Sequence, residues 1–299
     1  MQFWALFEGI GPIKCAVASW TKEHREICGE PRSDTRMTTA WTKWVVGLCV
    51  ASSATVSIGQ PVAEGQSALD KSLKAGTLRA CSPGDYQPFS YLRPDGQYEG
   101  IDIDLARSLA SAMGVELQLI KTSWPNLLAD LTSGKCELAI GGISVTLDRQ
   151  KKAFFSAAYM VNGKVPLARC ADVSKFQSLG DIDRAGVRVI VNPGGSNERY
   201  ARANVKSAVV IVHPENLTIF DELVANRADV FITEAAEALT QQRLRPALCA
   251  VNPDRPLQYG EMAYLLPRND VAMKAFVDQW LHLSKATGEY QRIVDKWLR

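Results

Sequence analysis

The chain has 299 residues, a length that allows one large or two medium-sized domains. Hydrophobic residues make up 46% and charged residues 22%, as in ordinary globular proteins, and the net charge of +2 gives no indication of a nucleic-acid or membrane partner. The three histidines are isolated and no C-x-x-C occurs, so we expect neither a metal site nor a cofactor.

The first 59 residues differ from the rest of the chain. Residues 1–36 show no clear period, and we assign them no fold. Met37 begins a segment with the form of a secretory signal, in which Lys43 precedes the short apolar run Trp44–Val50 and small residues follow. We therefore expect a signal peptide over 37–59, with translation starting at Met37 and the preceding residues an extension or leader. A disordered tail is the alternative.

Four cysteines lie beyond this signal: Cys81, Cys136, Cys170 and Cys249. In an oxidising compartment they are compatible with two disulfides, for which three pairings exist. We favour Cys81–Cys136, because both residues lie at the edges of candidate core strands, and this leaves Cys170–Cys249. Buried free thiols are the alternative.

Predicted helices and strands alternate from residue 67 onward. In the first half we expect a helix over 67–74, a helix that residues 100–105 lead into and that runs to about 113, and a helix from 124 to about 134. We expect strands over 77–81, 115–120 and 136–140. In the second half we expect strands over 187–191, 208–212, 228–232 and 264–266, and helices from 198 to about 205 and over 218–225, 235–243, 271–286 and 290–298. This alternation predicts an α/β protein with parallel sheets, in which ligands bind at the carboxyl ends of strands.

The stretch N-P-G-G-S-N-E-R-Y at 192–200 follows one of these strands and starts a helix. Its glycines allow a close approach of the backbone to a ligand, and Ser196 or Asn197 is expected to cap the helix. The free N–H groups of the first turn would then form an anion site, with Glu198 pointing at the ligand. The alternative is a capped helix with an acidic residue in its first turn.

A series of motifs between residues 85 and 159 carries a resemblance to a known family. In chain order they are D-Y-x-P-F (85–89), G-x-D-x-D-L-A (100–106), Trp124, G-G-I-S-x-T-x-x-R (141–149) and F-S-x-x-Y (155–159). They resemble the family 3 periplasmic solute-binding proteins, over residues 73–298. The resemblance implies a two-lobe periplasmic binding protein-like fold (type II), with the second lobe inserted in the first. Lobe 1 would be 67–168 plus 258–299 and lobe 2 would be 169–257, with crossovers near 164–170 and 249–259.

Longer stretches are similar to one branch of that family, the secreted cyclohexadienyl dehydratases: T-S-W-P-N-L (122–127), G-G-I-S-V-T-L-D-R-Q (141–150), N-G-K-x-P-x-x-R-C (162–170), N-P-G-G-S-N-E-R (192–199) and T-I-F-D-E (218–222). This resemblance implies conversion of prephenate to phenylpyruvate and of arogenate to phenylalanine in the periplasm. It also implies that Glu198 is the general acid. Glu234 is a departure, because many relatives carry aspartate there.

The resemblance and the chemistry together give a candidate site. Arg149 would clamp a substrate carboxylate, and the other candidate substrate-binding residues are Ser144, Thr146, Ser196, Asn197, Lys164, Glu234, Trp124 and Phe89. Lys164 has a solvated hinge residue as its alternative, and the two aromatic residues have core packing as theirs. A binder without catalytic activity, which delivers an amino acid to a permease, is the alternative function. The oligomeric state stays open.

Overall fold

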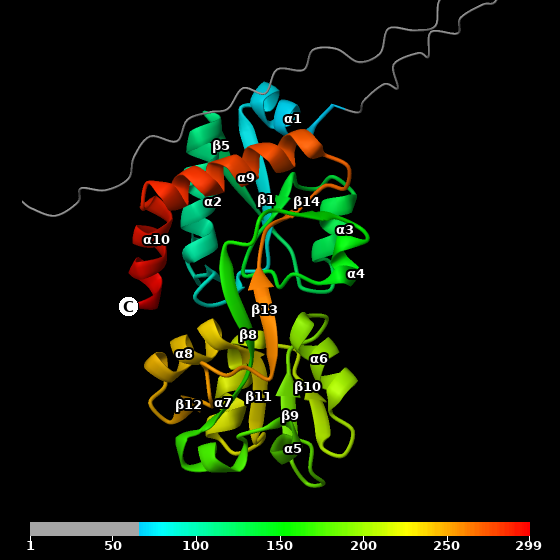
Figure 1. Cartoon of the computed structure of the whole chain (residues 1–299), viewed down its shortest axis with the longest axis vertical. Coiled ribbons are helices and arrows are strands. Elements are labelled where there is room, and N and C mark those ends of the chain that lie inside the picture. The colour runs from blue at the N-terminus through cyan, green and yellow to red at the C-terminus, as the bar shows by residue number, and fades with distance from the viewer. Residues whose placement is uncertain (1–65) are drawn as a thin grey trace, which may run out of the picture. The chain divides into compact units, whose positions relative to one another are not determined.

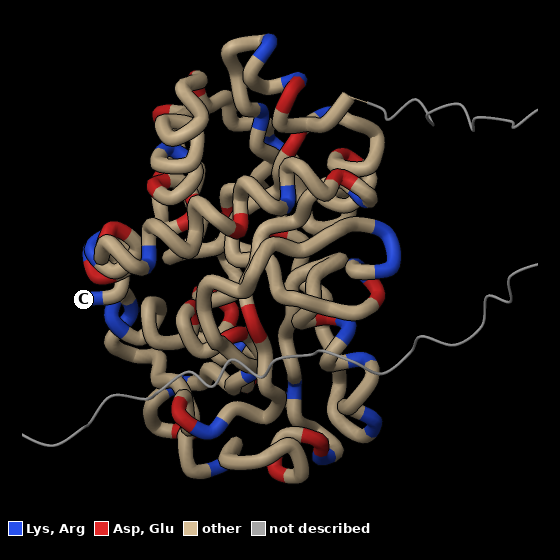
Figure 2. Tube along the Cα trace, turned by 45° about the horizontal axis from the view of Figure 1, so that its top comes forward, with Lys and Arg blue, Asp and Glu red and all other residues tan. Residues whose placement is uncertain are grey.

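The computed structural model describes residues 66–299, which form two lobes joined by two strands (Figure 1). The expected extension over 1–36 and the expected signal peptide over 37–59 lie outside the described residues. Within 66–299, no helix is long and apolar enough to cross a membrane. Acidic and basic residues are interspersed along the backbone of both lobes (Figure 2).

Lobe 1 is built on a five-stranded sheet of order β5–β1–β6–β14–β7. Its strands are β1 (Thr77–Ser82), β5 (Glu116–Lys121), β6 (Leu138–Ala139), β7 (Phe154–Phe155) and β14 (Leu265–Leu266). The first strand pairs parallel with β5 and β6, whereas β14 runs antiparallel to its neighbours. A small antiparallel sheet of β2 (Asp85–Tyr86), β3 (Ser90–Leu92) and β4 (Tyr98–Glu99) follows β1.

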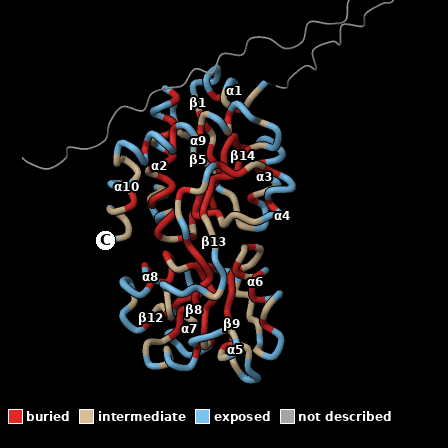
Figure 3. The backbone as a smooth tube through the Cα atoms, viewed as in Figure 1, coloured by how far each residue is buried: buried red, intermediate tan, exposed pale blue. Residues whose placement is uncertain are grey.

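The helices of lobe 1 are α1 (Ala68–Ala75), α2 (Ile101–Met113), α3 (Leu127–Thr132), α4 (Leu147–Gln150), α9 (Val271–Ala286) and α10 (Glu289–Leu298). The apolar residues of α2, α9 and α10 share one core with β1, and those of α3 belong to a second core. Covering both faces of a sheet is what a parallel sheet with apolar strands requires. The buried strands therefore lie inside the lobe and exposed residues gather on its outer helices (Figure 3).

Lobe 2 has a sheet of order β10–β9–β11–β8–β12, and β13 pairs with β8 outside this path. Its strands are β8 (Met160–Arg169), β9 (Arg188–Val191), β10 (Val209–Val212), β11 (Val230–Glu234), β12 (Leu248–Ala250) and β13 (Gln258–Met262). Its helical segments are η1 (Cys170–Lys175), α5 (Leu179–Ile182), α6 (Ser196–Asn204), η2 (Asn216–Thr218), α7 (Ile219–Val224) and α8 (Ala235–Leu244). Two apolar cores, one on each face, stabilise this sheet.

The chain passes between the lobes on β8 and β13. These strands pair antiparallel, from Met160 opposite Met262 to Lys164 opposite Gln258. The crossover between the lobes was predicted near 164–170 and 249–259. In the structure the paired segments are 160–164 and 258–262. We propose the division into 67–168 plus 258–299 and 169–257, with these two strands shared by both lobes.

Most predicted elements are present, and the long ones agree best. The helix predicted over 271–286 has the same bounds in the structure, and the helix predicted to run to about 113 ends at Met113. Gly114 takes a left-handed conformation at the end of α2, as the sequence indicates. The helix predicted over 124–134 is shorter, because residues 123–126 form a turn before α3 begins at Leu127.

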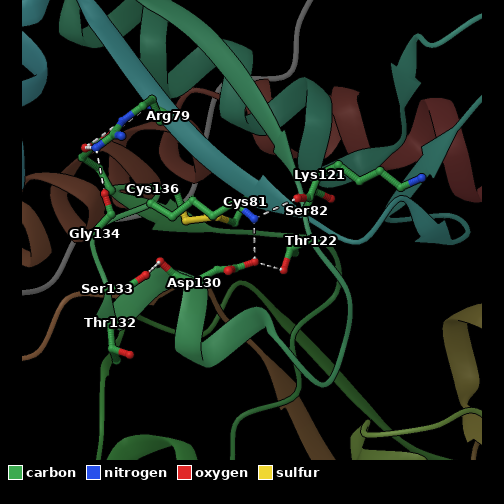
Figure 4. The surroundings of a disulfide bond; sticks show 12 residues. Arg79, Cys81, Ser82, Lys121, Thr122, Asp130, Thr132, Ser133, Gly134 and Cys136 are labelled. Carbon is green, nitrogen blue, oxygen red and sulfur yellow. Dashed lines mark hydrogen bonds and ion pairs between the residues drawn. A yellow bond between two sulfur atoms is a disulfide. The ribbon is translucent and has the colours of Figure 1, made fainter.

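Both favoured disulfides, Cys81–Cys136 and Cys170–Cys249, are confirmed. The first joins β1 to Cys136, shortly before β6 begins at Leu138 (Figure 4). Arg79 runs beside it, pairing with Glu137 and donating a hydrogen bond to the carbonyl of Gly134 at 3.0 Å. The second joins η1 to β12 at the far end of β8.

Candidate active site between the lobes

A buried ion pair lies where the two lobes meet. Lys164 and Glu234 are opposite each other on the antiparallel strands β8 and β11, and Lys164 Nζ donates to the carboxylate. The two residues are only 5% and 4% exposed. Burial alone would raise the pKa of Glu234, but Lys164 and the surrounding donors hold it below its usual value. Glu234 is therefore a carboxylate whose charge is already balanced.

Hydroxyl groups from both lobes complete the surroundings of Glu234. Ser144 of lobe 1 donates to its carboxylate at 2.7 Å and Ser196 of lobe 2 at 3.1 Å, and the two serine oxygens lie 2.9 Å apart. Tyr86 of β2 also donates to Glu234. Because these bonds run from one lobe to the other, the structure shows the lobes closed on each other.

Ser196 and Asn197 do not cap α6, so this expectation is wrong. The residue before the helix is Gly195, and no side chain accepts a hydrogen bond there. The reason is Lys164, whose Nζ donates to Ser196 Oγ at 2.8 Å and to Asn197 Oδ1 at 2.5 Å. Both side chains are turned toward the buried ion pair.

Glu237, in the first turn of α8, is a second buried carboxyl group at this site. It is 1% exposed and hydrogen-bonds with the hydroxyl of Thr233. Burial raises its pKa well above the usual value, and the negative charges of Glu234 and Asp85 raise it further. Glu237 therefore holds its proton to a higher pH than an ordinary glutamate, and it lies three residues after the ionised Glu234.

Glu198 has the opposite environment. Its carboxylate accepts the N–H of Gly194 at 2.7 Å and pairs with Arg202 at 2.8 Å. The bond from Gly194 is the main cause that lowers its pKa, and Arg202 lowers it further. In this arrangement Glu198 is ionised and has no proton to donate. Its assignment as the general acid stays a prediction.

Arg149 borders a cavity of about 430 Å³ that residues of both lobes line. Its Nη1 donates to the carbonyl of Ser144 at 2.9 Å, and its backbone N–H to the Thr146 hydroxyl at 3.3 Å, which places Thr146 at the start of α4. Burial lowers the pKa of Arg149 to about 10, and the nearby Arg199 contributes to the lowering. The guanidinium remains charged at neutral pH. Arg149 lines the cavity together with Trp124 and Gly194.

Gly194 lies against Pro125 of the other lobe. It has φ +73°, and a Cβ atom at this position would lie 2.6 Å from Pro125 Cγ of lobe 1. Any larger residue would clash with Pro125 as well as adopt a strained backbone. The glycine turn therefore allows α6 to close against the loop before α3.

The two predicted aromatic residues lie at different depths. Trp124 lines the cavity and donates from Nε1 to Asp85 Oδ1 at 2.8 Å. Phe89 is fully buried in the core of lobe 1 and stacks on Tyr86 with ring centroids 5.4 Å apart. Phe89 thus supports Tyr86, which contacts Glu234 directly.

Comparison with known proteins assigns the chain to a family. The pattern of the bacterial extracellular solute-binding proteins, family 3, matches residues 78–299. The chain belongs to family 3. This family assignment and the two-lobe architecture confirm the fold predicted from the motifs at 85–159.

The proteins that this chain is similar to include both an enzyme and binding proteins. A cyclohexadienyl dehydratase of Pseudomonas aeruginosa is 47% identical over 233 residues, which cover 78% of this chain and 87% of that protein. The L-cystine-binding protein TcyJ of Escherichia coli is 28% identical and covers 84% of this chain and 92% of its own length. A crystal structure of an ancestral amino acid-binding protein, described as a precursor of cyclohexadienyl dehydratase, superposes with a TM-score of 0.73 at 30% identity, covering 78% of this chain and all of that one.

Sequence reasoning missed Tyr86 and Glu237 as site residues. Tyr86 lies in the same D-Y-x-P-F motif as Phe89, which was predicted as a substrate-binding residue. This motif could have indicated that Tyr86 also belongs to the site. Glu237 follows Glu234 by three residues, a spacing that puts both on one side of a helix start. Within residues 66–299 there is no cluster of acidic, cysteine or histidine side chains that could hold a metal ion.

Proposed function

We propose that this protein is a cyclohexadienyl dehydratase, which converts prephenate to phenylpyruvate and arogenate to phenylalanine. The observation that carries the proposal is the 47% identity over 233 residues to a protein of that name. The site between the lobes supports it, because it contains a buried carboxyl group with a raised pKa and an arginine that lines a cavity.

The reaction needs one proton and a correctly held dianion. Prephenate loses its ring carboxylate as carbon dioxide, and the electrons of the broken C–C bond move into the ring and expel the hydroxyl group. A general acid protonates that hydroxyl so that it leaves as water. The protein therefore has to bind the carboxylates, exclude bulk water and keep one acid protonated at neutral pH.

Glu237 meets the last requirement better than Glu198 does. A catalytic acid works best when its environment raises its pKa toward the working pH, and pairs of carboxyl groups whose pKa values are pushed apart identify such sites. Glu237 and Glu234 form such a pair, and Glu198 is held ionised by Gly194 and Arg202. We therefore propose Glu237 as the general acid.

An amino-acid binder without catalytic activity is the second candidate, favoured by the L-cystine-binding relative. A buried ammonium group needs an anionic partner. Glu234 is the carboxylate at the centre of the site, and Lys164 already balances its charge. This pairing favours prephenate, which has no ammonium group, as the ligand of the site, and it disfavours amino acids, arogenate included.

The test is to incubate the purified protein with prephenate and to follow phenylpyruvate by its absorbance in alkali. We expect turnover by the parent protein, a loss of about 10²–10⁴-fold in Glu237→Gln, and a much smaller loss in Glu198→Gln. The two isosteric variants control for each other, since each removes one carboxyl group from the same region.

No turnover in the parent would exclude the dehydratase. A large loss in Glu198→Gln, with Glu237→Gln close to the parent, would instead return the acid role to Glu198. Circular dichroism of both variants checks that the fold is unchanged.

We also propose that the protein works in the periplasm. The family is extracellular, and the two disulfides require an oxidising compartment. The expected signal over 37–59 would direct it there. Protein recovered in the periplasmic fraction with both disulfides oxidised is the expected result.

A further inference from the structure

Two arginines face the same cavity from opposite lobes. Arg149 comes from lobe 1 and Arg199 from the first turns of α6 in lobe 2, and both line the cavity of about 430 Å³. Their guanidinium groups donate to backbone carbonyls, Arg149 to Ser144 at 2.9 Å and Arg199 to Gly194 at 3.2 Å. Within residues 66–299 neither of them forms an ion pair with a carboxylate.

Other arginines of lobe 2 do form ion pairs with carboxylates. Arg202, one turn further along α6, pairs with Glu198, and Arg184 pairs with Asp181. Arg199 is exposed like these two, yet it lies on the cavity side and forms no ion pair within 4.0 Å among the described residues, although, after Lys151, its charge also lowers the pKa of Asp148, which lines the same cavity. Its charge therefore remains available to an anion in the cavity.

The two cationic groups are close enough to influence each other. Burial is the largest cause of the lowered pKa of Arg149, and the positive charge of Arg199 is the second largest. Two like charges that approach each other on closure repel, and the cost falls when an anion lies between them. An anion with two carboxylates can pair with both groups at once.

We propose that Arg199 is a second carboxylate-binding residue, and that the cavity holds a dicarboxylate with one carboxylate on Arg149 and the other on Arg199. The identity of the dicarboxylate as prephenate rests on the proposed function. Prephenate contains the carbon frame of 2-oxoglutarate, with three carbons between its two carboxylate groups. A monocarboxylate leaves one of the two guanidinium groups without a partner.

The experiment compares the parent with Arg199→Gln and with Arg184→Gln, a matched loss of one positive charge on lobe 2 outside the cavity. Calorimetry measures the affinity for 2-oxoglutarate, which has both carboxylates, and for 2-oxopentanoate, which has one. Steady-state assays measure kcat and KM for prephenate. We expect Arg199→Gln to weaken 2-oxoglutarate binding about 10- to 100-fold.

In the same variant we expect the prephenate KM to rise similarly, with a smaller change in kcat, and 2-oxopentanoate binding to stay close to that of the parent. Arg184→Gln should match the parent in every measurement. Equal losses for both oxo acids, or no loss for either one and an unchanged KM, would overturn the inference.

The two proposals can fail separately. If the parent does not turn over prephenate but binds 2-oxoglutarate through Arg199, the dicarboxylate site stands and the dehydratase does not. If the parent turns over prephenate and Arg199→Gln has the same KM, the dehydratase stands and Arg199 is not a substrate contact. If the parent neither turns over prephenate nor binds 2-oxoglutarate, both are wrong.

Discussion

At the residue scale, Glu234 and Glu237 show how the environment gives two identical side chains different pKa values. Both lie at the start of α8, where the helix dipole stabilises a negative charge by roughly 0.3–1 kcal/mol. Burial can shift a carboxyl pKa by several units, which is a larger effect. Lys164 offsets the effect of burial on the pKa of Glu234, whereas Glu237 has only a hydroxyl partner and its pKa is raised.

This difference predicts how stability depends on pH. The pKa of Glu237 is raised in the folded protein, and in the unfolded chain it is about 4.3. Between these two values the folded state binds more protons than the unfolded state, so the contribution of Glu237 to stability falls as pH rises above about 4.3. We expect Glu237→Gln to become progressively more stable than the parent as pH rises. Urea unfolding of both proteins between pH 4.5 and 8 measures this, and a constant difference in the free energy of unfolding would contradict it.

At the element scale, both disulfides join segments that are close in the fold and distant in the sequence. Cys170 and Cys249 are 79 residues apart, and their link fixes η1 against β12 on the outer edge of lobe 2. Closing a loop of this size in the unfolded chain stabilises a protein by about 2–4 kcal/mol.

We therefore expect the double variant Cys170→Ser, Cys249→Ser to lose about 2–4 kcal/mol of stability while retaining its catalytic site, which lies at the opposite end of β8. Chemical unfolding with and without reductant provides the measurement. Reductant serves as an internal control, because the variant should respond less than the parent does. An equal response would contradict the expected pairing.

The elements could be predicted because their signals are local. Asp270 caps α9 and glycine ends α2, so these helices have recognisable boundaries in the sequence. Glu237 could not be identified in this way, since its burial depends on residues of lobe 1 that are more than 140 positions earlier, such as Tyr86. The capping role of Ser196 was predicted wrongly for the same reason, because a cap is inferred from local sequence, whereas Lys164, which binds Ser196, comes from another strand.

At the scale of the whole molecule, the lobes also touch away from the candidate active site. Arg243 of α8 in lobe 2 donates to the carbonyls of Trp297 and Leu298 at 2.9 and 2.7 Å, at the end of α10 in lobe 1. This contact borders a second cavity, of about 470 Å³, which residues of both lobes line. Because the contact requires adjacent lobes, it stabilises the closed arrangement.

We expect Arg243→Ala to favour an open arrangement and to raise KM several-fold with little change in kcat, since its side chain is not part of the substrate site. Small-angle scattering should show a larger radius of gyration for the variant without ligand, and 2-oxoglutarate should reduce the difference. Identical scattering profiles for parent and variant would mean that this contact does not influence closure.

The position of β14 determines the order in which the lobes can form during synthesis. Residues 169–257 are contiguous and include most of lobe 2, so that lobe is available as soon as they have been translated. Lobe 1 has to wait, because β14 lies between β6 and β7 in its sheet but comes more than 100 residues after them. A nascent chain that stops before Leu265 therefore carries a complete second lobe beside a first lobe whose sheet is missing an inner strand, and this incomplete sheet is the aggregation-prone part of the unfinished protein.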